Sequence, residues 1–105
     1  METKRYAMVS TDGVSVDEHF GLATQFLIYD MEDPPVLVEK RKTETLSTGD
    51  PDHPFDADKF ARIAALLKDC SRVYVTRIGE TPSARLKEMG VEPVIYAGAI
   101  ADIAR

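Results

Sequence analysis

The chain has one cysteine, fewer basic than acidic residues and no long apolar run, and each scarcity excludes a class of protein. With Cys70 alone, it can form no internal disulfide and cannot supply the four thiolates of a structural zinc or iron–sulfur site. A net charge of −5 and a pI near 4.9 argue against nucleic-acid binding, which requires a basic face. No signal-peptide core and no membrane-spanning stretch occurs. We therefore expect a cytoplasmic protein that has neither nucleic acid nor a membrane as a partner.

The size and the apolar content suit one compact domain over residues 1–105. Hydrophobic residues make up 44% of the chain, enough for one core, and the chain is too short for two ordinary domains. Five segments combine apolar, β-branched or aromatic residues with flanking turn signals and predict strands. One of them becomes charged at Lys40, Arg41 and Lys42, which is typical of a strand at a sheet edge. The five predicted strands are residues 4–10, 25–31, 36–43, 72–77 and 91–96.

Three further segments predict helices. The first carries its apolar residues on one stripe, with acidic residues at its beginning and Lys68 at its end, as the helix dipole favours. The second, residues 83–89, follows Thr81 as N-cap and Pro82 at the first helical position, and ends at a left-handed Gly90. The third is short, residues 99–104. The stripe of the first helix consists of Phe60, Ile63, Ala64 and Leu67, preceded by Asp56 and Asp58.

The order of these elements predicts an α/β fold. A hairpin formed by residues 25–43 comes early, and strand–helix–strand units with right-handed parallel crossovers follow it. We expect a mixed five-stranded sheet flanked by helices on both faces. Residues 13–21 and 45–55 are rich in turn-forming residue types and are expected to be loops.

A histidine between carboxylates marks the first of these loops. Residues 16–21 read VDEHFG, and loops at strand ends are where α/β proteins bind ligands. A neutral imidazole nitrogen of His19 could ligate a metal, with Asp17 or Glu18 orienting the ring through its other nitrogen. The alternative is a histidine at a helix start that only hydrogen-bonds its neighbours. The spacing alone favours this second interpretation, because one histidine is a weak signal.

Other candidate groups are weaker. His53 lies among carboxylates and could share a metal with His19, but the prolines around it favour a stiff surface loop. Cys70 is typical of a small core residue. Residues 77–82 run from a strand end into a helix start, where Arg77 and free N–H groups beside Gly79 could form an anion-tolerant wall or simply a capped helix. No glycine-rich phosphate loop and no G-x-S-x-G nucleophile motif occurs.

The run VDEHFGLATQFLIYD, residues 16–30, looks like the opening signature of the dinitrogenase iron–molybdenum cofactor biosynthesis family. Residues 67–70, 73–79 and 86–94 resemble the same family in order and spacing, so that the likeness covers nearly the whole chain. The resemblance is strongest to the NifX-like proteins and to the carboxyl-terminal domain of NifB. The same family includes NafY and the orange proteins. One departure is Ser47, which stands where we would align a cysteine of NifB-type tails.

The resemblance implies a ribonuclease H-like fold and binding of iron–molybdenum cofactor or its iron–sulfur precursor, without enzymatic activity. The cargo and cofactor-assembly proteins would be the partners. By motif match, His19 is the candidate cluster ligand, and one histidine suffices because a preassembled cluster brings its own sulfides. Such clusters carry negative charge, so that Arg77 or Arg41 would line the pocket. The predicted cofactor-binding residues are Asp17, His19, Phe20, Gly21, Arg77 and Gly79, with His19 as the metal ligand.

Two other functions remain open from the sequence. The chain could be a regulatory or protein-interaction domain without a cluster, which contacts a partner through its sheet edge or through residues 45–55. A metal-dependent nuclease would need several carboxylates to converge on Mg²⁺ or Mn²⁺, and the acidic balance of the chain would repel its substrate.

Overall fold

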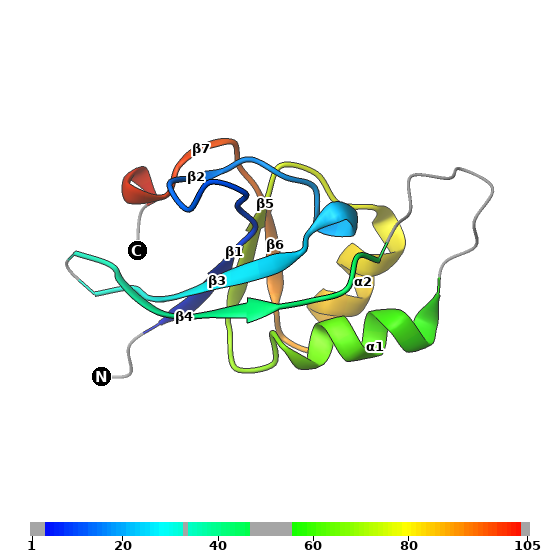
Figure 1. Cartoon of the computed structure of the whole chain (residues 1–105). Helices are drawn as coiled ribbons and strands as arrows, with labels where there is room; N and C mark the ends of the chain where they lie inside the picture. The colour runs from blue at the N-terminus through cyan, green and yellow to red at the C-terminus, as the bar shows by residue number, and fades with distance from the viewer. Residues whose placement is uncertain (1–3, 33, 47–55, 104–105) are drawn as a thin grey trace.

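A five-stranded sheet forms the centre of the computed structural model, which describes residues 4–32, 34–46 and 56–103 (Figure 1). The strands lie in the order β4-β3-β1-β5-β6. β3 is antiparallel to both of its neighbours, whereas β1, β5 and β6 run parallel to one another. The predicted mixed sheet, its hairpin and its edge strand are therefore confirmed. The bounds are β1 (Arg5–Met8), β3 (Gln25–Asp30), β4 (Val36–Lys42), β5 (Arg72–Val75) and β6 (Glu92–Ile95).

Two of the three predicted helices are present as α-helices, and one of them begins earlier than predicted. α1 (Ala57–Ala65) follows Asp56, whose carboxylate accepts a hydrogen bond from the Lys59 N–H at 2.9 Å. α2 (Glu80–Glu88) has Gly79 as its N-cap, so the predicted Thr81 cap is wrong and Pro82 is the third helical residue. Proline is tolerated there because the first-turn N–H groups have no intrahelical partner. No helix in the described ranges is long and apolar enough to cross a membrane.

The two α-helices cover the same face of the sheet. Alternate strand residues such as Ala7, Ile28 and Val73 point toward this face, because successive side chains of a strand point to opposite sides. They form one buried cluster with the apolar stripe of α1 and with Leu86 of α2. The prediction of α-helices on both faces is therefore wrong for the described residues.

A second, two-stranded sheet covers the opposite face. β2 (Ser15–Val16) pairs antiparallel with β7 (Gly98–Ala99), and the 3-10 turn η2 (Ile100–Asp102) follows. Where residues 99–104 predict a helix, the described part forms this short strand and single turn instead. Figure 1 shows β2 and β7 on the side of the sheet away from α1. The cluster beneath them contains Tyr6, Met8, Val16, Leu27, Met31, Tyr74, Ile100 and Ile103.

The three parallel strands end at the same edge of the sheet, here called the carboxyl edge. β1 leaves at Met8, β5 at Val75 and β6 at Ile95, and each strand continues into a loop there. Residues 13–21, predicted as one loop, contain β2 and lead into the 3-10 turn η1 (Phe20–Leu22). This carboxyl edge carries the candidate site.

Candidate functional site at the carboxyl edge of the sheet

His19 lies on a backbone that two hydrogen bonds hold against the end of β5. The Thr76 N–H donates to the Glu18 carbonyl oxygen at 3.1 Å, and the Phe20 N–H donates to the Arg77 carbonyl oxygen at 2.9 Å. These bonds fix the residues on both sides of His19. Figure 1 shows the resulting contact between η1 and the chain that leads from β5 to α2.

The side chain of His19 points to solvent. Within the described ranges its imidazole has no hydrogen-bond partner, and the residue is exposed. A neutral imidazole placed in this way can offer either ring nitrogen to a metal.

Phe20 anchors the segment in the core. Its side chain is 1% exposed, and its ring centroid lies 6.1 Å from that of Phe26 and 6.3 Å from that of Phe60. Tilted aromatic pairs at such distances are favourable, and burial of a phenylalanine stabilises the fold. The neighbouring Gly21 lies within η1 and is half-buried. In this conformation Phe20 positions His19 and offers no ring surface to a ligand.

The carboxylates beside His19 bind the backbone and a hydroxyl rather than the imidazole. Asp17 accepts hydrogen bonds from the Thr11 N–H at 2.8 Å and from the Thr11 hydroxyl at 2.6 Å. Glu18 accepts from the backbone N–H of His19 at 2.8 Å. In this conformation neither carboxylate is hydrogen-bonded to the imidazole, so an orienting role of Asp17 or Glu18 stays a prediction.

Arg77 and Gly79 lie on the chain that leads from β5 to α2, and the Arg77 carbonyl oxygen accepts the N–H of Phe20 beside His19. The Arg77 side chain is exposed, and among the described residues it has no ion-pair partner. Gly79 caps α2 at φ −72°, and a Cβ there would meet Pro82 at an ordinary 3.5 Å, so that glycine is not required for the backbone. The structure thus brings Asp17, His19, Phe20, Gly21 and Arg77 together at one edge, with Gly79 at the following helix start.

Arg41, also predicted near the site, is engaged elsewhere. Its guanidinium donates to both carboxylate oxygens of Asp69 at 2.7 and 2.9 Å and to the Leu66 carbonyl oxygen at 2.6 Å. It also pairs with Glu39. These contacts hold β4 against the end of α1, so Arg41 is not a free counter-charge for an anion.

Asp12 holds a turn that follows β1, and the sequence does not predict the hydrogen bonds that this carboxylate accepts. Asp12 accepts hydrogen bonds from the Val14 and Ser15 N–H groups, both at 2.8 Å, and from the hydroxyls of Ser10 and Ser15. These bonds, first that of the Ser15 N–H, lower the pKa of Asp12 to about 2. In the sequence, the Asp12-Gly13 pair indicates only a turn. The number of hydrogen bonds that Asp12 accepts depends on the three-dimensional path of the loop.

No bare-ion site is present in the described parts of the chain. No group of three or more His, Cys, Asp or Glu side chains there is close enough to hold a metal ion. Cys70 is 4% exposed, and burial raises the pKa of its thiol to about 12, which confirms its prediction as a core residue. His53 and Ser47 lie outside the described residues. A single histidine suits a preassembled cluster better than a bare ion, which needs several protein ligands.

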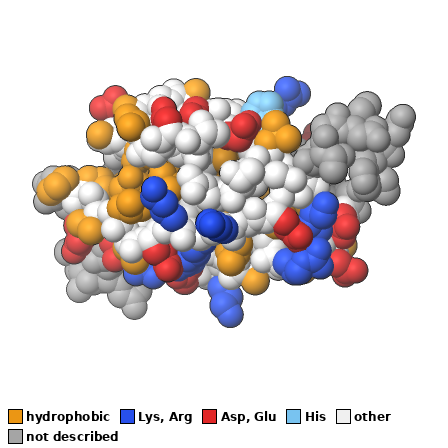
Figure 2. All heavy atoms as spheres, viewed as in Figure 1, with side chains coloured by type: hydrophobic (Ala, Val, Ile, Leu, Met, Phe, Trp, Pro, Cys, Tyr) orange, Lys and Arg blue, Asp and Glu red, His pale blue; other side chains and the backbone are white. Residues whose placement is uncertain are grey.

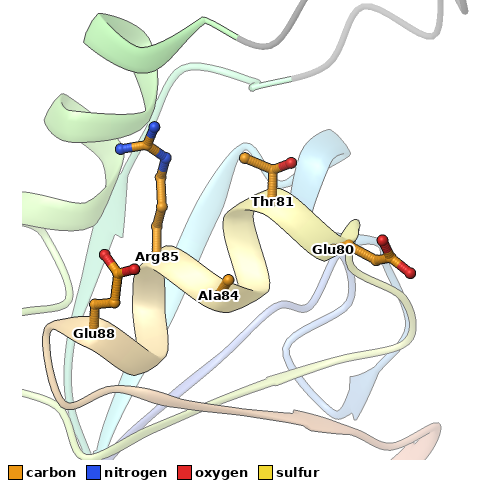
Figure 3. A pocket seen from close by; sticks show the side chains of 5 residues that line it. All are labelled: Glu80, Thr81, Ala84, Arg85 and Glu88. Atoms are coloured by element: carbon orange, nitrogen blue, oxygen red, sulfur yellow. The ribbon is translucent and has the colours of Figure 1, made fainter.

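A shallow hollow of about 380 Å³ on α2 is a poor anion site. Its side chains project from one helix, with Glu80 at the amino end and Arg85 and Glu88 toward the carboxyl end (Figure 3). Two carboxylates in this wall disfavour a negatively charged ligand. The lining residues are Glu80, Thr81, Ala84, Arg85 and Glu88.

Comparison with known proteins identifies the family. The sequence model described as dinitrogenase iron-molybdenum cofactor matches residues 3–105. The chain belongs to this family. It is 40% identical over 92 residues to the FeMo cofactor biosynthesis protein NifB of Klebsiella pneumoniae, an alignment that covers 85% of this chain and 20% of that protein. It is 31% identical over 93 residues to NifX of Azotobacter vinelandii, covering 86% of this chain and 54% of that protein.

A solved structure supports the fold of this family member. An NMR structure of a Thermotoga protein described as NifB superimposes with a TM-score of 0.59 at 22% identity, covering 92% of this chain and 80% of that one. At this identity the likeness concerns the fold alone. The chain spans about a fifth of the NifB relatives and about half of NifX. The predicted resemblance to NifX-like proteins and to part of NifB is confirmed.

Proposed function

We propose that this chain binds a preassembled iron–molybdenum cofactor, or its iron–sulfur precursor, and carries it without transforming it. Membership in the family supports a role in cofactor biosynthesis. Because the chain spans only about a fifth of the NifB proteins, the activity of a whole NifB is not assigned to it. The observation that carries the proposal is His19, an exposed imidazole on a backbone fixed at both neighbouring residues.

The proposed site needs one protein ligand and a surrounding surface. A preassembled cluster brings its own sulfides and other bound groups. The protein therefore has to supply one ligand for an open metal position and a surface that fits the cluster. The two bonds to the end of β5 keep His19 preorganised, which lowers the entropy lost on binding. Asp17, Phe20 and Gly21 would hold the segment in place, and Gly79 would begin the adjoining helix.

Arg77 would supply the counter-charge. The Arg77 residue is exposed, and its carbonyl oxygen accepts the backbone N–H of Phe20, the residue that follows His19. A guanidinium donates several hydrogen bonds and keeps its charge, so it suits the sulfide and oxygen atoms of an anionic cluster. Local charge rather than the net charge of −5 would then govern binding.

Three finer points belong to the same proposal. We infer one domain over residues 1–105, a ribonuclease H-like classification of its sheet, and a cytoplasmic location in keeping with the single cysteine. Cofactor-assembly proteins would deliver and receive the cargo. An interaction domain that lacks a cluster is the competing function, and the following experiment separates the two.

Anaerobic titration with a metal–sulfur cluster tests the proposal. The parent chain and His19→Ala are titrated with iron–molybdenum cofactor or an iron–sulfur precursor, and uptake is read from absorbance and from metal co-eluting on a sizing column. We expect stoichiometric uptake by the parent and at least about tenfold weaker binding by His19→Ala. Because His19 is exposed and makes no side-chain bond to the described residues, the variant should unfold at the parent temperature.

Two further variants make the result specific. His53→Ala removes the other histidine and should leave uptake unchanged. His19→Cys offers a thiolate in place of the imidazole and should recover part of the binding. Absence of uptake by the parent, or equal uptake by His19→Ala and the parent, would reject the carrier function with His19 as ligand.

A further inference from the structure

One outer edge of the five-stranded sheet is formed by β4. Among the described residues β4 pairs only with β3, and every residue of β4 except Arg41 is exposed. Its first half is apolar, with Val36, Leu37 and Val38 exposed by 47%, 43% and 41%. In Figure 2, apolar and basic side chains adjoin over the part of the molecule where Figure 1 draws β3 and β4.

The charged half of β4 presents two lysines. Arg41 turns toward α1 and is bound by Asp69. Lys40 and Lys42 lie two residues apart, opposite Leu27 and Gln25 of β3, and therefore on the other face from Arg41. Neither lysine has an ion-pair partner among the described residues.

The main chain of the two lysines also faces outward. The Thr43 N–H donates to the Thr24 carbonyl oxygen at 3.0 Å, so this pair is hydrogen-bonded between the strands. In an antiparallel ladder such pairs alternate with pairs whose polar groups point away from the neighbour. Lys42 and Lys40 are of the second kind, and their N–H and C=O groups point to the free edge.

Two features disfavour a second copy of this chain as the occupant. If the outward groups of Lys40 and Lys42 pair with the same groups of another β4, every register places a lysine opposite a lysine. At the other edge, the N–H groups of Glu92 and Tyr96 donate to the carbonyl oxygens of Ser71, just before β5, and of Val75 at its end. This leaves Pro93 facing outward without an N–H. The β6 edge is thus a poor partner for β4.

We propose that the β4 edge binds an acidic, extended segment of a partner protein, which adds to the sheet as an antiparallel strand. Carboxylates two residues apart would lie opposite Lys42 and Lys40, and apolar residues after them would cover Val36, Leu37 and Val38. The register shift opposite Ile28 and Tyr29 makes Val38 an extra residue, so only a short ladder can form. This surface is distinct from His19, and its use does not depend on cluster binding.

A labelled peptide tests the proposal on the intact chain. The probe is a fluorescein-labelled Glu-Thr-Glu-Thr-Val-Val peptide, and binding is followed by fluorescence anisotropy up to roughly 1 mM. We expect K40E/K42E to bind it at least about tenfold more weakly than the parent. The matched variant K68E/K87E changes the same charge at exposed lysines elsewhere and should bind within about twofold of the parent.

A second peptide distinguishes strand addition from charge attraction. Methylation of the amide nitrogens of both glutamates keeps the charge but removes the N–H groups that would face β4, and should weaken binding at least about tenfold. Hydrogen exchange of the backbone N–H groups of Lys40 and Lys42 should become slower when the unmodified peptide binds.

Four outcomes would overturn the proposal. These are no binding of the acidic peptide, equal binding of the methylated peptide, equal losses in the two lysine variants, and a parent chain that dimerises through β4. The last outcome would be seen as a concentration-dependent size that K40E/K42E abolishes.

Discussion

At the scale of single residues, carboxylates hold the loops that carry His19. Asp12 folds the turn after β1 by accepting several hydrogen bonds, and Asp17 closes onto Thr11. The backbone N–H of Asp17 also donates to the Val9 carbonyl oxygen at 3.3 Å. Charge-assisted bonds of this kind are stronger than neutral ones, but they require an ionised carboxylate. The turn that Asp12 holds at the carboxyl edge is therefore expected to depend on pH.

The Asp12 turn should contribute a pH-dependent part of the stability. Its pKa is lowered from 3.8 to about 2, so its contribution is fully present above pH 3.8 and disappears as the pH falls toward 2. We expect Asp12→Asn to be less stable than the parent at pH 7 and nearly equal to it at pH 2. Urea unfolding followed by circular dichroism between these pH values measures the difference.

A charge-matched control separates this effect from general acid unfolding. Glu32→Gln removes an exposed carboxylate that accepts no hydrogen bond from the described residues. Its free energy of unfolding should run parallel to that of the parent across the pH range. A constant difference between Asp12→Asn and the parent from pH 7 to pH 2 would contradict the assigned role of the carboxylate.

At the scale of elements, a charged network ties the edge strand to α1. Asp69 follows α1 and binds Arg41 of β4 and, at 3.1 Å, Arg5 of β1. Hydrogen bonds from Arg41 hold the pKa of Asp69 well below its usual range. Arg41 also satisfies the Leu66 carbonyl oxygen, one of the groups that a helix end leaves without an intrahelical partner.

Removal of the Arg41 guanidinium should therefore weaken the fold. Arg41→Met keeps most of the apolar stem but leaves Asp69 and the Leu66 carbonyl without this donor. Because the Asp69 side chain is 42% exposed, we expect a modest loss of about 1 kcal/mol. Unfolding in guanidinium chloride measures this loss, provided that the slope of the free energy against denaturant concentration does not change. Lys40→Met on the same strand is the control, and its free energy of unfolding should stay within about 0.5 kcal/mol of the parent value. Equal losses in the two variants would count against the network.

The elements differ in how far the sequence predicts them. α1 follows from a local pattern, since its apolar stripe and its Asp56 cap lie within one segment. The start of α2 does not, because Gly79 takes the extended cap conformation and the first turn tolerates Pro82. The role of Arg41 also escapes prediction, because its partner Asp69 lies 28 residues away.

At the scale of the whole molecule, contacts between distant segments complete the fold. The five-stranded sheet is predictable because each strand has its own apolar pattern. The β2–β7 sheet is not, since two-residue strands have no period and Val16 meets Gly98 only after the chain has folded. The site divides in the same way: the family motif singles out His19, whereas the partners of Asp17 depend on loop closure.

The β2–β7 sheet relies on an unusual glycine. Gly98 has φ +151°, and a Cβ there would lie 3.2 Å from the Tyr96 hydroxyl oxygen. That hydroxyl donates to the Ala99 carbonyl oxygen at 2.6 Å and so fixes the end of β7. The layer that β7 completes covers the buried cluster around Tyr6 and Tyr74. A side chain at position 98 would strain the backbone and press on this hydrogen bond at once.

Gly98→Ala should therefore loosen the cover of the second core. We expect a loss of about 1–3 kcal/mol in the free energy of unfolding, together with faster amide exchange at Val16 and Ile100. Gly79→Ala is the matched control: its φ of −72° is ordinary and its Cβ would meet Pro82 at 3.5 Å, so stability should change by less than about 1 kcal/mol. If both alanine variants lost the same stability, the cost would come from glycine replacement in general. A loss confined to Gly98→Ala, with cluster uptake at His19 retained, would show that this layer supports the fold independently of the site.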